Sequence, residues 1–252
     1  MRDRTGADGM AKLKTTVPLF LTELHPCSYL DDRLACSAFV HPSFELNTAV
    51  YSKLVERGFR RSGDYVYAPR CPQCAECIPA RVPVNRFKPK RKQNRCLQKN
   101  AAMHTVVKPA RFEQAHYDLY LKYQNSRHHD GSMAKSTPEE YMSFLGSHWC
   151  NTLFVEFLLD ETLIAVAVVD RLDHGLSAVY TFFDPEHADR SPGVYAILWQ
   201  IEWAKRMHLD WLYLGFWIKD CRKMAYKIDY QPIELLLDSV WQAFDFAEAM
   251  GD

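Results

Sequence analysis

The sequence predicts a mixed α/β (α+β) fold in two units, and three observations support this prediction. Residues 17–105 are rich in Pro, Arg and Cys and contain only short predicted segments. Residues 106–252 instead alternate amphipathic helices with apolar, β-branched strands. The 252 residues, of which 48% are hydrophobic and 25% charged, can bury a substantial core. Residues 1–16 have no apolar run, so we expect a disordered leader and no secretory signal.

The N-terminal unit contains one well-marked helix, predicted over residues 47–58. Val50, Leu54 and Val55 fall on one face of this helix, and Gly58 is a typical residue to end it. Short strands are predicted over residues 65–67 and 78–84. Prolines around these strands keep the segments brief.

The C-terminal unit has a longer and more regular order of elements. Helices are predicted over residues 112–123 and 138–145, followed by strands over 153–159, 163–170 and 177–183. A crossover helix over 194–207, strands over 211–217 and 233–237, and a closing helix over 241–250 complete it. This order predicts a GNAT-like acyltransferase domain, in which the start of the crossover helix faces the ligand.

Charge is distributed very unevenly along the chain. Between Arg57 and Lys99 there are twelve Arg or Lys and two acids, a local net charge of +10 in a chain that sums to zero. Eight basic residues between Arg81 and Lys99 are interrupted by no acid at all. Such a stretch indicates a surface for a nucleic acid. Its candidate contacts are Arg86, Lys88, Lys90, Arg91, Lys92 and Arg95.

Several classes of function lack their sequence signals here. There is no GxxxxGK[ST] loop, no GxGxxG and no Q/R-x-x-G-x-G/A fingerprint for coenzyme A. The longest uncharged apolar run, residues 163–169, is far shorter than the ~20 residues of a membrane-spanning helix. Eight cysteines without a signal peptide indicate the reducing cytoplasm.

Eight segments in order are similar to one family. They are HPCSYL (from His25), GFRRSG (from Gly58), VYAPRCP (from Val66), RVPV (from Arg81), VYTFFDP (from Val179), GVYAIL (from Gly193), WLYLGFWI (from Trp211) and CRKMAYK (from Cys221). The chain resembles the arginyl-tRNA–protein transferases, in particular their bacterial branch, the aspartate/glutamate leucyltransferases.

The resemblance implies an activity and its partners. Leucine would pass from leucyl-tRNA to the α-amine of proteins that begin with Asp or Glu, and this would mark them for degradation through the N-degron pathway. No cofactor and no membrane would be required. Arginyl-tRNA as the donor is the nearest alternative. A coenzyme A-dependent N-acetyltransferase and an RNA-binding module without catalysis are more distant ones.

The predicted reaction needs an amine nucleophile, a proton acceptor, donors for an oxyanion, and cations for acidic groups. Because the donor ester is already activated, we expect direct attack by the amine. The catalytic candidates are Asp220, Asp184 and Tyr180. The candidates for binding the acidic N-terminus or the tRNA end are Arg60, Arg61, Lys223, Tyr226 and Lys227.

Cys27, Cys71, Cys74 and Cys77 are candidate ligands for zinc or an iron–sulfur cluster. Eukaryotic relatives pair a CxxC near the N-terminus with later adjacent cysteines, whereas the first pair here reads Cys27-Ser-Tyr-Leu30 and lacks a ligand. A cluster of reduced thiols is therefore favoured over a metal site. We expect His128-His129-Asp130 to form a loop at a helix end.

Overall fold

The computed structural model describes residues 16–127 and 135–244. The predicted leader up to residue 15, the His128-His129-Asp130 segment, and residues 245–250 of the predicted closing helix lie outside the described residues.

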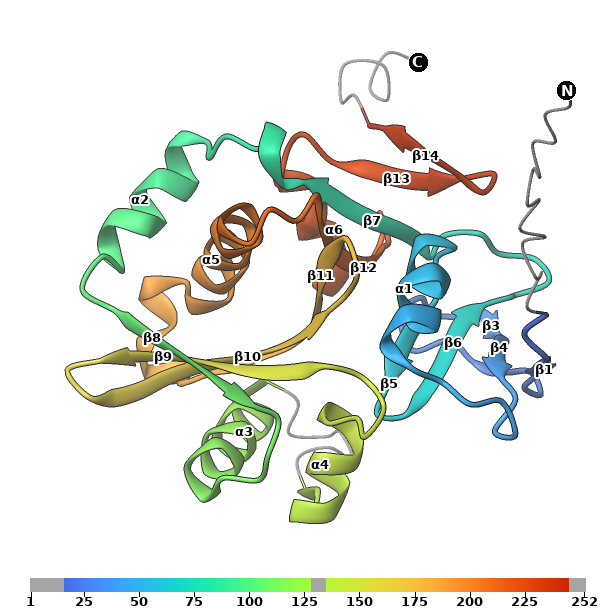
Figure 1. The fold of residues 1–252 in the computed structure, drawn as a ribbon, viewed down its shortest axis with the longest axis horizontal. Helices are drawn as coiled ribbons and strands as arrows, with labels where there is room; N and C mark the ends of the chain where they lie inside the picture. The colour runs from blue at the N-terminus through green and yellow to red at the C-terminus, as the bar shows by residue number, and fades with distance from the viewer. Residues whose placement is uncertain (1–15, 128–134, 245–252) are drawn as a thin grey trace, which may run out of the picture.

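A small antiparallel sheet and one helix form the N-terminal part (Figure 1). The sheet has the order β1-β4-β6-β5, with β1 (Leu19–Leu21), β4 (Ser37–Val40), β5 (Arg60–Ser62) and β6 (Tyr65–Pro69). A separate short pair joins β2 (His25–Pro26) and β3 (Leu34–Ala35). Helix α1 (Thr48–Glu56) confirms the prediction: the Asn47 side chain accepts a hydrogen bond from Val50 N at its start.

An eight-stranded sheet forms the larger part, in the order β14-β13-β7-β12-β11-β10-β9-β8. The strands are β7 (Ile78–Pro83), β8 (His104–Pro109), β9 (Thr152–Leu159), β10 (Thr162–Arg171), β11 (Gly175–Phe183), β12 (Trp211–Trp217), β13 (Glu234–Leu237) and β14 (Val240–Ala243). Neighbouring strands are antiparallel except β11 and β12, which are parallel.

Helices cover both faces of this sheet (Figure 1). Helix α5 (Pro192–Arg206) crosses over between the parallel strands, with α2 (Arg91–Lys99) beside it, and α3 (Gln114–Arg127) and α4 (Pro138–Leu145) lie on the other face. Antiparallel strands, a crossover helix and a parallel strand follow each other in the order predicted for a GNAT-like domain.

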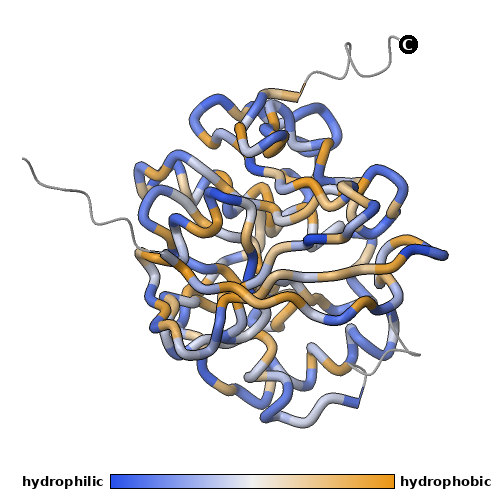
Figure 2. Tube along the Cα trace, turned by 90° about the vertical axis from the view of Figure 1, so that its right-hand side faces the viewer, coloured by the Kyte–Doolittle hydropathy of each residue, from blue (hydrophilic) through white to orange (hydrophobic). Residues whose placement is uncertain are grey.

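Residues along the central strand β10 alternate between two cores. Ala165, Ala167 and Val169 pack in the cluster under α5, while Val166 and Val168 pack in the cluster under α3 and α4. Because successive side chains of a strand point to opposite faces, a strand covered on both faces is apolar throughout. Figure 2 shows this as hydrophobic strands running through the middle of the molecule.

The large sheet takes strands from both sides of the predicted boundary at residues 105 and 106. Strand β8 crosses that boundary, and β7 lies between β12 and β13. The predicted closing helix is wrong over its first residues, since Val240–Ala243 form strand β14, paired with β13. Asp238 and Ser239 both have positive φ (49° and 65°), which suits a tight two-residue hairpin turn.

Short helical turns complete the chain: η1 (Val84–Arg86), η3 (Pro185–Arg190), α6 (Arg222–Ala225) and η4 (Tyr226–Asp229). None of the helices in the described ranges is both long and apolar enough to cross a membrane.

Candidate active site

The candidate site lies where strands β11 and β12 separate. The two strands pair only through residues 175–177 and 211–213. Beyond them, β12 stays paired with β7 as far as Trp217, and β11 stays paired with β10 as far as Phe183. Backbone groups that face such an opening need other partners.

Arg60, from β5 of the small sheet, supplies one of these partners. Its Nη2 donates a hydrogen bond to Ala178 O at 3.1 Å. Its guanidinium lies against Gly215, where φ is +80° and an added Cβ would come within 1.2 Å of Arg60 Nη1. Glycine at position 215 therefore allows both the backbone conformation and the close approach of the cation.

Lys227 lies beside Arg60, on η4 after the end of β12. The residue is only 5% exposed, and its Nζ donates a hydrogen bond to Phe216 O and contacts Met224 Sδ at 3.3 Å. Burial, and then the positive charge of Arg60, lower the pKa of Lys227 to about 7. At neutral pH a large share of this lysine is therefore an uncharged amine.

Tyrosines surround these two cations. Burial raises the pKa of Tyr29, Tyr67 and Tyr226, and that of Tyr29 reaches about 12. The positive charge of Arg60 lowers the pKa of all three, but burial outweighs it. The Lys227 Nζ lies 5.8 Å from the centre of the Tyr226 ring, which is 44% exposed. The site therefore offers neutral hydroxyl groups and two partly exposed aromatic rings, those of Tyr29 and Tyr226.

An open cavity of about 300 Å³ adjoins this site, because Phe216, Tyr29 and Cys77 form part of its wall. All four predicted cysteines line it, together with three arginines: Cys27, Cys71, Cys74, Cys77, Arg33, Arg57 and Arg70. Burial raises the pKa of the Cys77 thiol to about 12, and the other three sulfurs add to that effect. The cavity thus combines the neutral thiol of Cys77 with three exposed arginines.

These cysteines do not form a compact set of metal ligands. Across the described ranges, one group of His, Cys, Asp or Glu has its ligand atoms within 4.8 Å of one another, namely Glu113, His116 and Glu156. There the Lys108 ammonium lies 2.9 Å from Glu113 and 2.7 Å from Glu156, so a protein cation already neutralises the carboxylates.

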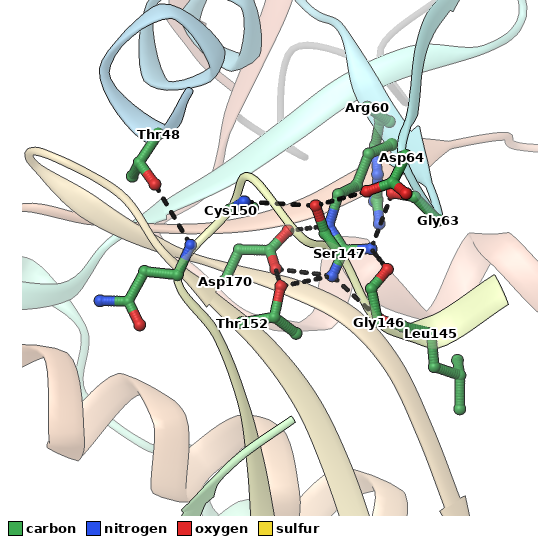
Figure 3. A network of polar contacts seen from close by, with 12 residues as sticks. Thr48, Arg60, Gly63, Asp64, Leu145, Gly146, Ser147, Cys150, Thr152 and Asp170 are labelled. Carbon is green, nitrogen blue, oxygen red and sulfur yellow. Dashed lines mark hydrogen bonds and ion pairs between the residues drawn. The ribbon is translucent and has the colours of Figure 1, made fainter. Parts of the chain in front are cut away.

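The prediction that Arg61 binds substrate is wrong. Its side chain is 0% exposed, and it pairs with the equally buried Asp170 at 2.6 Å. Its remaining donors reach the carbonyl groups of Gly63, Leu145 and Gly146 and the Thr152 hydroxyl. Figure 3 labels these partners together with Asp170. With every N–H bonded inside the protein, this guanidinium has nothing to offer a ligand.

The remaining substrate-binding candidate, Lys223, lies on a different helical turn from Lys227. Helix α6 ends at Ala225 and a 3-10 turn begins at Tyr226, so the two lysines do not share a face. Lys223 is exposed, whereas Lys227 points inward.

The three catalytic candidates are in different places. Asp220 is exposed just after β12. Asp184 pairs with Lys122 at 2.8 Å and accepts a hydrogen bond from Glu186 N at the start of η3. Tyr180 packs in the cluster under α3, where its hydroxyl accepts a hydrogen bond from Gln124 Nε2 at 2.9 Å. The structure does not bring these three side chains together as one catalytic group.

The predicted basic residues are all exposed, on helix α2 and the segment before it: Arg86, Lys88, Lys90, Arg91, Lys92 and Arg95. Helix α2 is held in place by its other face. Gln93 Nε2 donates a hydrogen bond to Asp229 O at 3.3 Å, two residues from Lys227, and the Asn100 amide that follows the helix donates one to Arg190 O at 2.9 Å. The basic surface is thus connected to the site through η4.

Sequence reasoning missed several parts of the site, among them Gly215, Tyr29 and the three arginines of the cavity. One signal was present in the sequence. A glycine inside the apolar strand WLYLGFW indicates a bulge or a close approach by another group. No local pattern brings Arg33, Arg57 and Arg70 to one cavity.

Comparison with known proteins identifies the family in both halves of the chain. The family described as "Arginine-tRNA-protein transferase, N terminus" matches residues 25–95, and its C-terminal counterpart matches residues 115–237. The chain is 47% identical over 232 residues to the aspartate/glutamate leucyltransferase of Hahella chejuensis, covering 92% of this chain and 99% of that one. It is 48% identical over 238 residues to the protein of the same name from Alcanivorax borkumensis, covering 94% and 98%.

Among solved structures, L-PGS from Bacillus licheniformis is 13% identical with a TM-score of 0.43, covering 66% of this chain and 58% of that one. Because both family segments match in order, and because relatives of nearly half identity align along almost their whole length, the chain belongs to the arginine-tRNA-protein transferase family.

Proposed function

We propose that this transferase moves leucine from leucyl-tRNA to the α-amine of proteins that begin with Asp or Glu. The relatives that align along nearly their whole length bear the name aspartate/glutamate leucyltransferase. One observation supports the proposal most directly: a cavity lined by Arg33, Arg57 and Arg70 adjoins the opening that holds Arg60 and Lys227. Arginines pair well with carboxylates, so an acidic N-terminal residue fits this cavity.

The donor fits the basic surface of helix α2. Its exposed cations suit the phosphates of a tRNA, and the helix is anchored to η4, which holds Lys227. A tRNA lying on α2 would bring its aminoacyl end toward the opening between β11 and β12. Leucyl-tRNA is a cytoplasmic molecule, which agrees with a cytoplasmic protein.

The transfer reaction needs little chemical participation by protein groups, because the ester is already activated. The acceptor α-amine attacks the carbonyl carbon of the leucyl ester, and the tRNA ribose leaves once the tetrahedral intermediate collapses. Placing the two reactants together provides most of the rate enhancement for such an activated ester. Arg60 can neutralise the negative charge that develops on the carbonyl oxygen.

The four cysteines fit this scheme as reduced thiols that shape the acceptor cavity, without a metal cofactor. Their sulfur atoms do not form a group of three within 4.8 Å of one another. Zinc and iron analysis of protein purified without oxygen tests this expectation, and a stoichiometric metal would contradict it.

The decisive assay offers labelled Leu-tRNA and Arg-tRNA with peptides that begin with Asp, Glu or Ala. We expect transfer from Leu-tRNA to the Asp and Glu peptides alone. Arg57→Ala combined with Arg70→Ala should raise the KM for acidic peptides about tenfold or more, since a charge-assisted pair contributes about 1.5–3 kcal/mol. Lys53→Ala combined with Arg171→Ala removes two exposed cations outside the cavity and is the matched control. Equal use of Ala peptides would contradict the proposed specificity.

A further inference from the structure

Lys227 is buried without an acidic partner among the described residues, which is unusual for a lysine that has only a structural role. It is 5% exposed, and no salt bridge joins it to an acid anywhere in the described parts of the chain. Burying a cation without a counter-ion costs free energy, and a hydrophobic residue of similar size would pack there without that cost.

The hydrogen bonds of Lys227 suit the neutral amine. Two acceptors from the described residues lie near Nζ, the Phe216 carbonyl and the Met224 sulfur. An ammonium group has three N–H donors and no lone pair. A neutral amine has two N–H donors, which match these two acceptors, and keeps one lone pair to accept a proton.

The charged and titratable groups around Lys227 act in both directions, and the neutral form prevails. In addition to burial, Arg60 approaches from β5 and lowers the pKa of Lys227, whereas Cys221 and Cys77 raise it by a smaller amount. Tyr226 lies on the same turn. Burial, followed by Arg60, lowers the pKa of Lys227 to about 7, the range in which a general base works well.

Lys227 is also close to both of the places that the reactants would use. Phe216, whose carbonyl accepts from Nζ, lines the acceptor cavity, and Arg60 lies in the opening between β11 and β12. A base at this position would lie behind Phe216, next to the cavity that the proposal assigns to the acceptor.

We propose that Lys227 is the general base and then the general acid of the transfer. The acceptor nitrogen forms a bond to the ester carbonyl carbon, and the proton that it loses passes to the lone pair of Lys227 Nζ. When the carbon–oxygen bond to the tRNA ribose breaks, the lysine returns that proton to the leaving oxygen. An amide and a free ribose hydroxyl result, and the lysine is neutral again.

This role rests on the proposed function and is tested with the full chain, Leu-tRNA and an Asp peptide. Single-turnover rates are measured against pH for the wild type, Lys227→Met and Lys227→Arg. In the wild type we expect the rate to fall in two steps as the pH is lowered, first below about pH 8 as the peptide amine becomes protonated and then below about pH 7 as the lysine does. Both variants should be about 10²–10⁴-fold slower and lose the lysine ionisation, because Met cannot accept a proton and Arg is always charged.

A second variant tests the base without replacing it. Arg60→Gln removes the positive charge that lowers the lysine pKa, so the acid limb of the rate profile should move to higher pH. Thermal unfolding gives the folding control. Lys227→Met should unfold at the same or a higher temperature below pH 7, where the wild type must hold a charged lysine in a buried place.

The outcomes separate the two proposals. If the wild type transfers leucine and Lys227→Met does so within threefold, with an unchanged pH profile, Lys227 is not the base and the proposed function stands. If the wild type transfers leucine to none of the peptides, the proposed function fails and the role of Lys227 fails with it.

Discussion

Arg60 and Arg61 are adjacent in the sequence, but they lie in opposite environments. They are consecutive residues of strand β5, so their side chains point to opposite faces. Arg61 enters the interior and pairs with Asp170, whereas Arg60 reaches the opening between β11 and β12. One arginine thus holds the small sheet against the large one, and the other remains available to a ligand.

The buried pair gives a prediction for single residues. Asp170→Ala should destabilise the fold by about 3–5 kcal/mol, because it leaves the Arg61 guanidinium charged and unpaired in the interior. Chemical denaturation monitored by circular dichroism measures the change. Asp189→Ala is the matched control, since its pair with Lys99 is exposed and should matter little. Equal stability of Asp170→Ala and wild type would show that the pair is not needed for folding.

At the scale of elements, helix α2 combines an exposed basic side with an anchored one. The buried Gln93 accepts a hydrogen bond from Lys90 N at the start of the helix and donates one to Asp229 O. Its exposed cations therefore point outward from a fixed helix. A flexible loop of the same composition would have to be ordered before it could bind, at a cost in conformational entropy.

The triple change Lys90→Ala, Arg91→Ala and Lys92→Ala should weaken tRNA binding and reduce its dependence on salt. Each lost phosphate contact lowers the slope of log affinity against log salt by about 0.7–0.9. Fluorescence anisotropy with labelled tRNA at several salt concentrations measures both effects. Lys53→Ala, Arg111→Ala and Arg171→Ala together remove the same charge from exposed positions away from α2, namely α1, the loop before α3 and the end of β10. If both triple variants lose affinity equally, α2 is no specific tRNA contact.

At the scale of the whole molecule, buried and half-buried carboxylates connect the helices to the sheet. Burial by itself would raise the pKa of Glu156, but hydrogen bonds from Lys108 and His116 lower it. The same holds for Asp184. Burial by itself would raise its pKa, but the pair with Lys122 outweighs burial and lowers it. A carboxyl group with a lowered pKa in the folded state stabilises the fold above its unfolded pKa, and this contribution disappears as the pH falls through the folded pKa.

Acid should therefore destabilise the protein below about pH 4.3, the ordinary pKa of a glutamate. The free energies of unfolding of the wild type and Glu156→Gln should differ most near neutral pH and converge toward pH 3. Urea denaturation at pH 7, 5 and 3.5 measures this. Glu161→Gln, at an 89% exposed side chain, is the control and should follow the wild type throughout. A constant difference between wild type and Glu156→Gln at all three values would contradict the assignment.

Local pattern in the sequence was enough to predict most of the fold. The continuous apolar run of β10, the apolar face of α1 and the order of helices and strands depend on neighbouring residues, so they can be inferred from the chain alone. Strand β14 was missed because Trp241 and Phe244 suit a helix or a strand equally, and pairing with β13 decided between them.

The sequence by itself determined the family, the basic surface and the position of the cysteines along the chain. Only the tertiary structure decided which arginine is buried, that Lys227 is enclosed beside Arg60, and that Cys27 joins the later three cysteines around one cavity. The physical reason is burial. The pKa of a lysine and the availability of an arginine depend on partners far away in the chain, such as Arg60 for Lys227 and Asp170 for Arg61.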